Sequence, residues 1–455
     1  MFLTFGKAPF VLFCVAILSG LGVLLLTPGG NQRRPDLIFA LFSKEHKQAY
    51  ERVIPEFERT HGVTVQLQLI DAHTLQTRLQ AAMQAGAEVP DVVEIVEPSL
   101  GFFSRGPLAD IGFVDLTQRV NEAGLRQRMV ASRFGLWTSR EHVFAIPHDV
   151  HPVMLAYRRD LFEKLDLHPE QMTTWNDFLA VGHKLVAMRG EDGFPRHYLI
   201  DLPSDGGGFF ITLLWQAGGG LFDAQGQVRF DDDIAKRVAL WFVQASRGPQ
   251  KISTPCGWGQ NLARCVVEER ALCFITPDWR TKQFELDMPD SAGKFALMPL
   301  PAWDADGRRT SVMGGTGIAI TKSSKKQDLA WEFIQELYLR DAAYGARYQA
   351  TNILPPMRSA WNLPELNRPN AFFSNQPIGA LYAALAPSVP EIYVTSYDDL
   401  ARSKITEAVV NIGLQYEAHG DNGLDAFATT ELQRCANYVR TSMARNHFIN
   451  EKQQP

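Results

Sequence analysis

Short apolar runs alternate with amphipathic stretches after a polar linker, PGGNQRRPD. The run LIFALF that follows is continuous and short, which is typical of a buried strand of a parallel sheet. In the next stretch, KEHKQAYERVIPEFERTHG, Ala49, Val53 and Phe57 recur at four-residue intervals. This spacing predicts one amphipathic helix, with Ser43 at its N-cap and Gly62 at its C-terminal end.

The pattern then changes to strict alternation. VTVQLQLI places Val63, Val65, Leu67 and Leu69 on one face, as in a half-buried strand. LQTRLQAAMQAG carries one apolar helical stripe, formed by Leu75, Leu79 and Met83, and PDVVEIV is the next short strand. Strands that alternate with helices predict an α/β layer with parallel pairing.

The remainder of the chain again alternates predicted strands and helices, and a change of domain could occur at the first junction. HVFAIPHDVHPVMLAYRRDLFEKL predicts two strands that meet between Pro147 and Pro152, then a helix that opens near Asp160. The middle, from about Thr173 to Arg270, predicts helices separated by glycine-rich turns. ALCFITPDW, FALMPLP and GIAIT return to strand character before a long helix, DLAWEFIQELYL.

Size and charge narrow the classes of function. A chain of 455 residues with 45% hydrophobic and 21% charged content can build two or more globular lobes. The 45 Lys and Arg residues against 50 Asp and Glu residues give a net charge of -5, which provides no general attraction to phosphate backbones. We therefore expect no nucleic-acid partner.

The amino-terminal segment from Ala8 to Thr27 contains no charged residue. Its length is close to the ~20 residues with which a helix crosses a bilayer, and it predicts an uncleaved membrane anchor. A cleaved signal peptide is the alternative, although its apolar region is usually about 7 to 15 residues. Lys7 precedes the segment and Arg33 and Arg34 follow it, so the charges leave its orientation open.

Five cysteines bear on the redox environment. Cys14 lies in the apolar segment, and Cys256, Cys265, Cys273 and Cys435 can pair in three ways. In an oxidising compartment a disulfide could join Cys256 to Cys265; small buried thiols are the equal alternative. The chain has no CxxC motif and no cluster of Cys and His of the kind that binds zinc.

Together and in this order, several stretches resemble a known family: the extracellular solute-binding proteins of ABC importers, in the sugar-binding branch that includes maltose-binding protein. They run from about Leu37 to Tyr338: VIPEFERTHGVTVQLQLI, LQAAMQAGAEVPDVVEI, FAIPHDVHPVMLAYRRDLFEKL followed by TTWNDFLAVGHKL, ALCFITPDW, and MGGTGIAITKSSKKQDLAWEFI. NILPPMRS is similar to the loop that follows the family's long helix.

The resemblance implies an α/β protein of two lobes, each discontinuous in sequence, with a ligand cleft between them and strands that cross from one lobe to the other. Closure about this hinge would present the bound ligand to permease subunits in the membrane. The expected divisions are residues 1–35 for the anchor and linker, 36–146 with 271–321 for lobe 1, 147–270 with 322–445 for lobe 2, and 446–455 for a polar tail.

The resemblance also implies a place in the cell: the extracytoplasmic (periplasmic) face of the bacterial cytoplasmic membrane. Many relatives are lipoproteins, but here Val11, Leu12 and Phe13 precede Cys14, so the cysteine has no small residue before it. The apolar segment itself is therefore expected to anchor the protein.

Sugar sites combine polar groups for the hydroxyls with an aromatic ring for the C–H face. Asp149, in PHDVHP, matches a position from which relatives bind a ligand hydroxyl; a turn-capping role is the alternative. Asp278 and Trp279, in TPDW, match the position of an aromatic platform in relatives, with packing between secondary-structure elements as the alternative. Trp215, in LLWQAGGG, is a further candidate, or a residue on the buried face of a helix.

Backbone groups could also contact a ligand. Gly314, Gly315 and Thr316, in MGGTG, let N–H groups approach closely, although a tight turn explains them equally well. No GK[ST] follows, so the motif is not a P-loop.

Strand ends supply the remaining candidates. Phe42, Ser43 and Lys44 end the first strand, where Ser43 could also serve only as a helix cap. Glu94, Glu97 and Ser99 belong to the end of PDVVEIV, and we expect one of them to face the ligand, with Glu97 as the candidate. Tyr393 and Tyr397 could add late contacts or lie on the surface.

Two other functions remain as alternatives. A glycosidase could use Glu94 with Glu97, or Asp149 with Asp278, as its carboxylate pair, but no hydrolase motif accompanies them. A ligand-sensing partner of a membrane receptor would use the same fold.

Neither a cofactor nor a metal ion is expected. His148 and His151 bracket Asp149, and the sequence indicates no further metal ligands beside them.

Overall fold

The computed structural model describes residue 15 and residues 34–448. The chain divides into a unit Met1–Asp36 and a unit Leu37–Pro455, and the fold below is that of the second unit. The anchor expected between Ala8 and Thr27 lies outside the described residues, apart from Val15. Within the described residues, no helix has both the length and the apolar character that crossing a membrane requires.

One five-stranded sheet has the order β2-β1-β3-β12-β6. Its strands are β1 (Leu37–Leu41), β2 (Val65–Leu69), β3 (Val92–Val96), β6 (Ile146–Pro147) and β12 (Thr316–Ile320). The pairs β1–β2 and β1–β3 are parallel, as predicted, whereas β12 runs antiparallel to β3 and β6.

The long helix predicted after β1 is in fact two helices, so that prediction was wrong. They are α2 (Lys44–Tyr50) and α3 (Ile54–His61), with Pro55 in the first turn of α3. Proline has no N–H for the helical ladder and is tolerated only in a first turn, which explains the break. Both predicted end signals are confirmed: the Ser43 side chain caps α2, and Gly62 ends α3 at a φ of 66°.

Further helices accompany this sheet in the chain. They are α4 (Ala72–Gln84), α5 (Ser99–Phe103), α6 (Thr117–Glu122), α7 (Leu125–Arg128), α14 (Gln327–Ile334) and α15 (Asp341–Thr351). Leu75 and Leu79, two members of the predicted stripe on α4, are buried. A two-stranded ribbon, β4 (Thr138–Ser139) with β5 (His142–Val143), lies outside both larger sheets.

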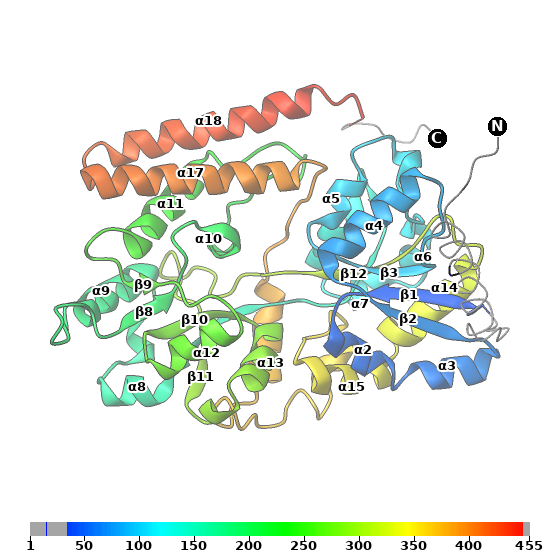
Figure 1. Ribbon diagram of the computed structural model, residues 1–455, viewed down its shortest axis with the longest axis horizontal. Coiled ribbons are helices and arrows are strands. Elements are labelled where there is room, and N and C mark those ends of the chain that lie inside the picture. Colours follow the sequence, from blue (N-terminus) through cyan, green and yellow to red (C-terminus); the bar gives the residue numbers. More distant parts are fainter. Residues whose placement is uncertain (1–14, 16–33, 449–455) are drawn as a thin grey trace, which may run out of the picture. The chain divides into compact units, whose positions relative to one another are not determined.

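The second five-stranded sheet has the order β11-β7-β10-β8-β9 and lies apart from the first in Figure 1. Its strands are β7 (Val153–Arg158), β8 (Tyr198–Asp201), β9 (Ser253–Thr254), β10 (Ala271–Pro277) and β11 (Phe295–Pro299). β10 pairs parallel with β8 and antiparallel with β7, which is also antiparallel to β11.

The helices of this half include a long carboxy-terminal pair. In chain order they are α8 (Arg159–Lys164), α9 (Trp175–Val186), α10 (Gly207–Gln216), α11 (Asp233–Ser246), α12 (Gln260–Val267), α13 (Asp278–Asp287), α16 (Ile378–Leu385), α17 (Asp398–His419) and α18 (Leu424–Ala444). Helices α17 and α18 pack side by side against α11 (Figure 1).

The structure divides the chain differently from the expected lobes at two places, because α14 and α15, expected in the second lobe, contact β12 and α2 in the half built on the first sheet. We expected residues 271–321 to accompany the first lobe. Hydrogen bonds instead place β10 and β11 in the second sheet, and only β12 returns to the first. Local sequence patterns predict strands but not their partners, because pairing joins residues far apart in the chain.

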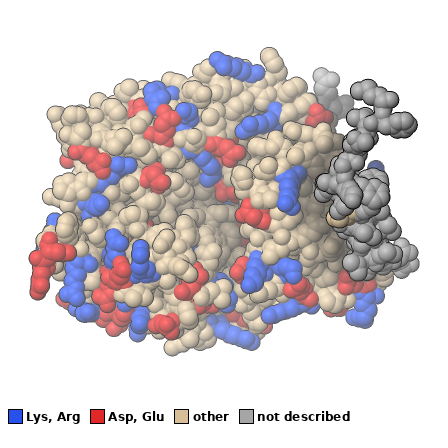
Figure 2. Space-filling view, viewed as in Figure 1, with Lys and Arg blue, Asp and Glu red and all other residues tan. Residues whose placement is uncertain are grey.

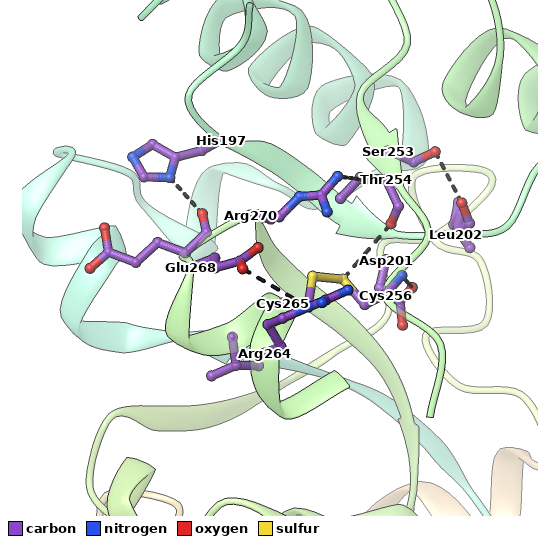
Figure 3. Close-up of a disulfide and its surroundings, with 12 residues drawn as sticks. His197, Asp201, Leu202, Ser253, Thr254, Cys256, Arg264, Cys265, Glu268 and Arg270 are labelled. Carbon is purple, nitrogen blue, oxygen red and sulfur yellow. Dashed lines mark hydrogen bonds and ion pairs between the residues drawn. A yellow bond between two sulfur atoms is a disulfide. The ribbon is translucent and has the colours of Figure 1, made fainter. Parts of the chain in front are cut away.

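A disulfide joins Cys256 to Cys265, whose Cα atoms are 5.5 Å apart (Figure 3). It settles the alternative that the sequence left open for this pair, while Cys273 and Cys435 are free and buried. The backbone N–H of Cys256 donates to Asp201 Oδ1 at 2.9 Å. The disulfide therefore fixes the loop that leads from β9 into α12, on which Trp258 lies.

Candidate functional site

A cavity of about 420 Å³ lies where the loops after β1 and β3, the residues before β12, and α13 converge. Six predicted candidates line it: Ser43, Glu97, Trp279, Gly314, Gly315 and Thr316. Phe42 and Lys44 also line it. β1 and β3 are parallel, so their carboxyl ends meet at one edge of the sheet, where ligands of open α/β sheets bind.

An aromatic shelf flanks the cavity and consists of Trp279, Trp258 and Phe209. Trp279 lies in the first turn of α13, and its indole Nε1 donates to the Met313 carbonyl oxygen at 3.0 Å. Trp258 stacks beside Trp279 with ring centroids 5.9 Å apart and 21° between the planes, and Phe209 continues the stack at 6.2 Å. The Arg280 guanidinium lies 4.5 Å from the Trp258 ring centre.

Trp258 is 47% exposed, although it belongs to this stack. Sequence reasoning missed it, but there was a signal: its GWG context between two cysteines places a large aromatic residue on a constrained loop. The shelf thus presents apolar ring surface beside the cavity, the kind of surface on which the C–H face of a sugar packs.

His151 also lines the cavity and lies between two buried carboxylates. Its Nδ1 is 2.6 Å from Asp278 Oδ1, and its Nε2 is 3.0 Å from Asp149 Oδ2. Burial opposes the charge on the ring, but attraction to Asp149 and Asp278 outweighs burial and raises the pKa of His151 to about 9. His151 is therefore an imidazolium that donates from both nitrogens at neutral pH.

Asp149 and Asp278 lie beneath the cavity wall and are fully buried. Asp149 also accepts from Arg133 Nη2 at 3.1 Å and from the Thr316 N–H at 2.8 Å. Burial would raise the pKa of Asp149, but His151 and the neighbouring donors hold it well below its ordinary value. The backbone N–H of Leu354 donates to Asp278 Oδ2 at 2.7 Å, so both carboxylates are occupied within the protein.

Glu97 reaches the cavity from the end of β3 and forms an ion pair with Arg402 of α17. Arg402 also pairs with Asp398 and lies 5.3 Å from the Trp215 ring centre. Trp215 itself is buried and lines a separate cavity of about 100 Å³ rather than the larger one. Burial raises the pKa of Asp398 to about 6, although attraction to Arg402 opposes this change.

The glycines before β12 allow close packing. Gly314 has a φ of 92°, a conformation that favours glycine. A Cβ on Gly315 would lie 2.7 Å from Leu136 Cδ1 and 2.8 Å from Arg133 Nη2. The carbonyl oxygen of Gly315 accepts from the Glu97 N–H at 2.9 Å. This segment is therefore a turn that also lines the cavity.

The remaining candidates do not line the larger cavity. Glu94 is buried and bonded to tyrosines and a histidine, and the Ser99 hydroxyl donates to Gln76 Oε1 at 2.9 Å. Tyr393 lines the smaller cavity, whereas Tyr397 lines neither.

The chain is similar to known binding proteins over most of its length. The family model described as bacterial extracellular solute-binding protein matches residues 43–344. An arabinooligosaccharide-binding protein of Bacillus subtilis (strain 168) is 22% identical over 348 residues, which cover 75% of this chain and 78% of that protein. A lactose-binding protein of Rhizobium radiobacter is 23% identical and covers 70% of this chain and 74% of its own.

Solved structures share the fold. The sugar-binding protein MalE of Xanthomonas citri superposes with a TM-score of 0.70 at 18% identity, over 90% of this chain and 98% of its own. This likeness shows that the two chains share an α/β fold.

Proposed function

The chain belongs to the family of bacterial extracellular solute-binding proteins, and we propose that it captures a mono- or oligosaccharide outside the cytoplasmic membrane for an ABC importer. The observation that carries this proposal is the cavity of about 420 Å³ with Trp279 in its wall. The relatives that bind arabinooligosaccharides and lactose support a carbohydrate as the ligand.

The charges around the cavity suit a neutral ligand. Glu97 forms an ion pair with Arg402. The Lys282 Nζ lies 2.9 Å from Glu285 Oε2. His151 is held between two carboxylates. Because most of these charges have partners within the protein, they can orient hydroxyl groups without demanding a charged ligand. On the face that Figure 2 shows, Lys and Arg side chains are interspersed with Asp and Glu side chains.

Ligand capture would use closure of two lobes, each built on one sheet. Residues 271–300 then belong with the second lobe, because β10 and β11 pair there. Two segments run from a strand of one sheet to a strand of the other, β6 to β7 and β11 to β12, and they touch at the bridge between Pro152 and Val312. A third passage between the two halves leads from α15 to α17. The Thr310 hydroxyl adds hydrogen bonds of 2.9 and 3.1 Å to Val153. We place the hinge at these paired segments.

The amino-terminal segment completes the proposal. An apolar stretch from Ala8 to Thr27 would hold the protein at the outer face of the membrane, close to the permease subunits that receive the ligand. A cleaved signal would instead leave a free protein, which mass spectrometry of the mature amino terminus distinguishes.

We propose a binding protein and not an enzyme. A glycosidase needs two carboxyl groups that reach the substrate. Asp149 and Asp278 are buried and share His151, and Glu94 does not line the cavity. Recovery of a chemically altered sugar after incubation would contradict this interpretation.

Calorimetry on the full-length protein tests the function. We expect one member of a panel of mono- and oligosaccharides to bind, and Trp279→Ala to weaken its binding at least about tenfold, or ~1.4 kcal/mol. Trp331→Ala is the matched control, because Trp331 lies on α14 and does not line the cavity. Absence of binding by every sugar, or equal loss in both variants, would refute the proposal.

A further inference from the structure

A cluster of polar side chains is buried at the wall of the cavity, and one of them, His46, also lines the cavity. It contains His46 of α2, Glu94 of β3 and His148, which follows β6. One ligand atom from each lies within 4.8 Å of the others. All three residues are at most 3% exposed.

The His148 ring lacks the partners that a buried imidazole needs. Neither of its nitrogens makes a hydrogen bond, and its Nδ1 is 3.5 Å from Asp149 Oδ2. Leaving such a group buried without a partner costs about 1–3 kcal/mol. The ring lies 4.4 Å from the His46 ring, so its free nitrogens are beside another possible ligand.

Glu94 is oriented for a ligand on one oxygen. Its Oε1 accepts from the Tyr50 hydroxyl at 2.5 Å and from the Tyr338 hydroxyl at 2.6 Å. Its Oε2 faces His46 Nδ1 at 3.0 Å. The two tyrosine hydrogen bonds hold Oε1 and leave Oε2 facing the imidazole. Hydrogen bonds of this kind orient the ligands of metal sites.

We propose that His46, Glu94 and His148 form a binding site for a divalent transition metal ion of the zinc class. Two imidazoles and one carboxylate are a ligand set that zinc accepts, with a fourth position left for water. Ligand atoms around a tetrahedral zinc ion lie about 3.3 Å apart, so the 3.0 Å between His46 and Glu94 already fits. The proposal requires the His148 ring to turn toward the other two ligand atoms, since the three atoms lie within 4.8 Å of one another.

Arg347 brings a cationic side chain close to this cluster. Its Nη2 donates to the His148 carbonyl oxygen at 3.4 Å, and its guanidinium lies 5.2 Å from the Tyr338 ring centre. Glu94 supplies the negative charge that faces a divalent ion, since Asp149 is already paired with Arg133 and His151.

Among the described residues a second group, Glu407, Glu431 and Cys435, has similar spacing. There the Arg434 guanidinium already forms ion pairs with both carboxylates, at 2.7 Å from Glu431 Oε1. The Arg434 guanidinium therefore occupies the place that a metal ion would take. Unlike the histidine cluster, this group offers no nitrogen without a partner.

Titration of the full-length protein tests the site. After treatment with a chelator, we expect calorimetry to show one equivalent of Zn²⁺ bound, and Co²⁺ to give the visible absorption of a tetrahedral site. His148→Gln and Glu94→Gln should each weaken binding at least about tenfold. His183→Gln, on a partly exposed face of α9, should bind as the wild type does.

A measurement on the wild type alone keeps the proposal testable if a variant fails to fold. X-ray absorption of the zinc-loaded protein should show two imidazoles in the first coordination shell. Absence of zinc binding, a shell without two imidazoles, or unchanged binding by a folded His148→Gln protein would overturn the proposal and leave a buried water as the partner of His148.

Discussion

Replacement of His151 by glutamine removes the only imidazolium that the structure places between Asp149 and Asp278. The two carboxylates then remain buried with a neutral amide between them. Breaking a buried ion pair by removing one partner costs about 3–5 kcal/mol. We therefore expect the free energy of unfolding of His151→Gln to fall by that amount at pH 6.5.

The pH dependence of the free energy of unfolding provides a second, more specific test. The pKa of His151 is raised from 6.5 to about 9 in the folded protein, which corresponds to about 3 kcal/mol of stability. Because the folded value is the higher one, this stability is complete below pH 6.5 and is lost as the pH rises through about 9. The charged groups in contact with His151 are the carboxylates of Asp149 and Asp278.

Urea unfolding, followed by tryptophan fluorescence from pH 6.5 to 9.5, measures both effects. The wild type should lose about 3 kcal/mol more than His151→Gln across this range. His183→Gln should follow the wild type, because that ring is partly exposed on α9. Parallel loss of stability in the wild type and His151→Gln would refute the assignment of the charge to His151.

Three further predictions concern the walls of the cavity. Trp258→Ala should weaken binding of an oligosaccharide more than binding of its monosaccharide, because Trp258 extends the shelf beyond Trp279. Calorimetry with both sugars tests this, and equal losses of affinity for the two sugars would contradict the prediction. Arg402→Gln should lower the free energy of unfolding by about 3 kcal/mol, because it leaves the largely buried carboxylates of Glu97 and Asp398 without their cation. Urea unfolding that matches the wild type would argue against this. Reduction of the disulfide between Cys256 and Cys265, which are 9 residues apart, should lower the stability by about 2.5 kcal/mol in the same assay, whereas Cys256→Ser should be insensitive to the reductant.

Much of the fold follows from local patterns of the sequence. The strands β1, β2 and β3 and helix α4 lie where the apolar periodicity predicts them. The break before Pro55 was missed because the apolar spacing continues through it, while the missing N–H of proline acts on the backbone alone. The partners of β10 and β11 could not be predicted, since nothing within a strand records which distant strand it pairs with.

The site was predictable where it depends on strand ends. Ser43 and Glu97 follow parallel strands, so topology alone brings them to one cavity. Asp149 and Asp278 show what the sequence hides: whether a carboxylate faces a ligand or a neighbouring side chain depends on His151, which comes from a turn with a φ of 55°. Trp215 is hidden in the same way, because Arg402, far along the chain, covers its ring.

The contacts of Asp149 also constrain how the lobes move. Arg133 and the Thr316 N–H bind this carboxylate from the side of the first sheet, and His151 joins it to Asp278 at the start of α13. Opening the lobes by separating these groups would expose a buried ion-pair network, at a cost comparable to the 3–5 kcal/mol of a broken buried pair. A binding protein that must open and close readily cannot lose that much in each cycle. We therefore expect the pivot of lobe closure to lie at the network itself.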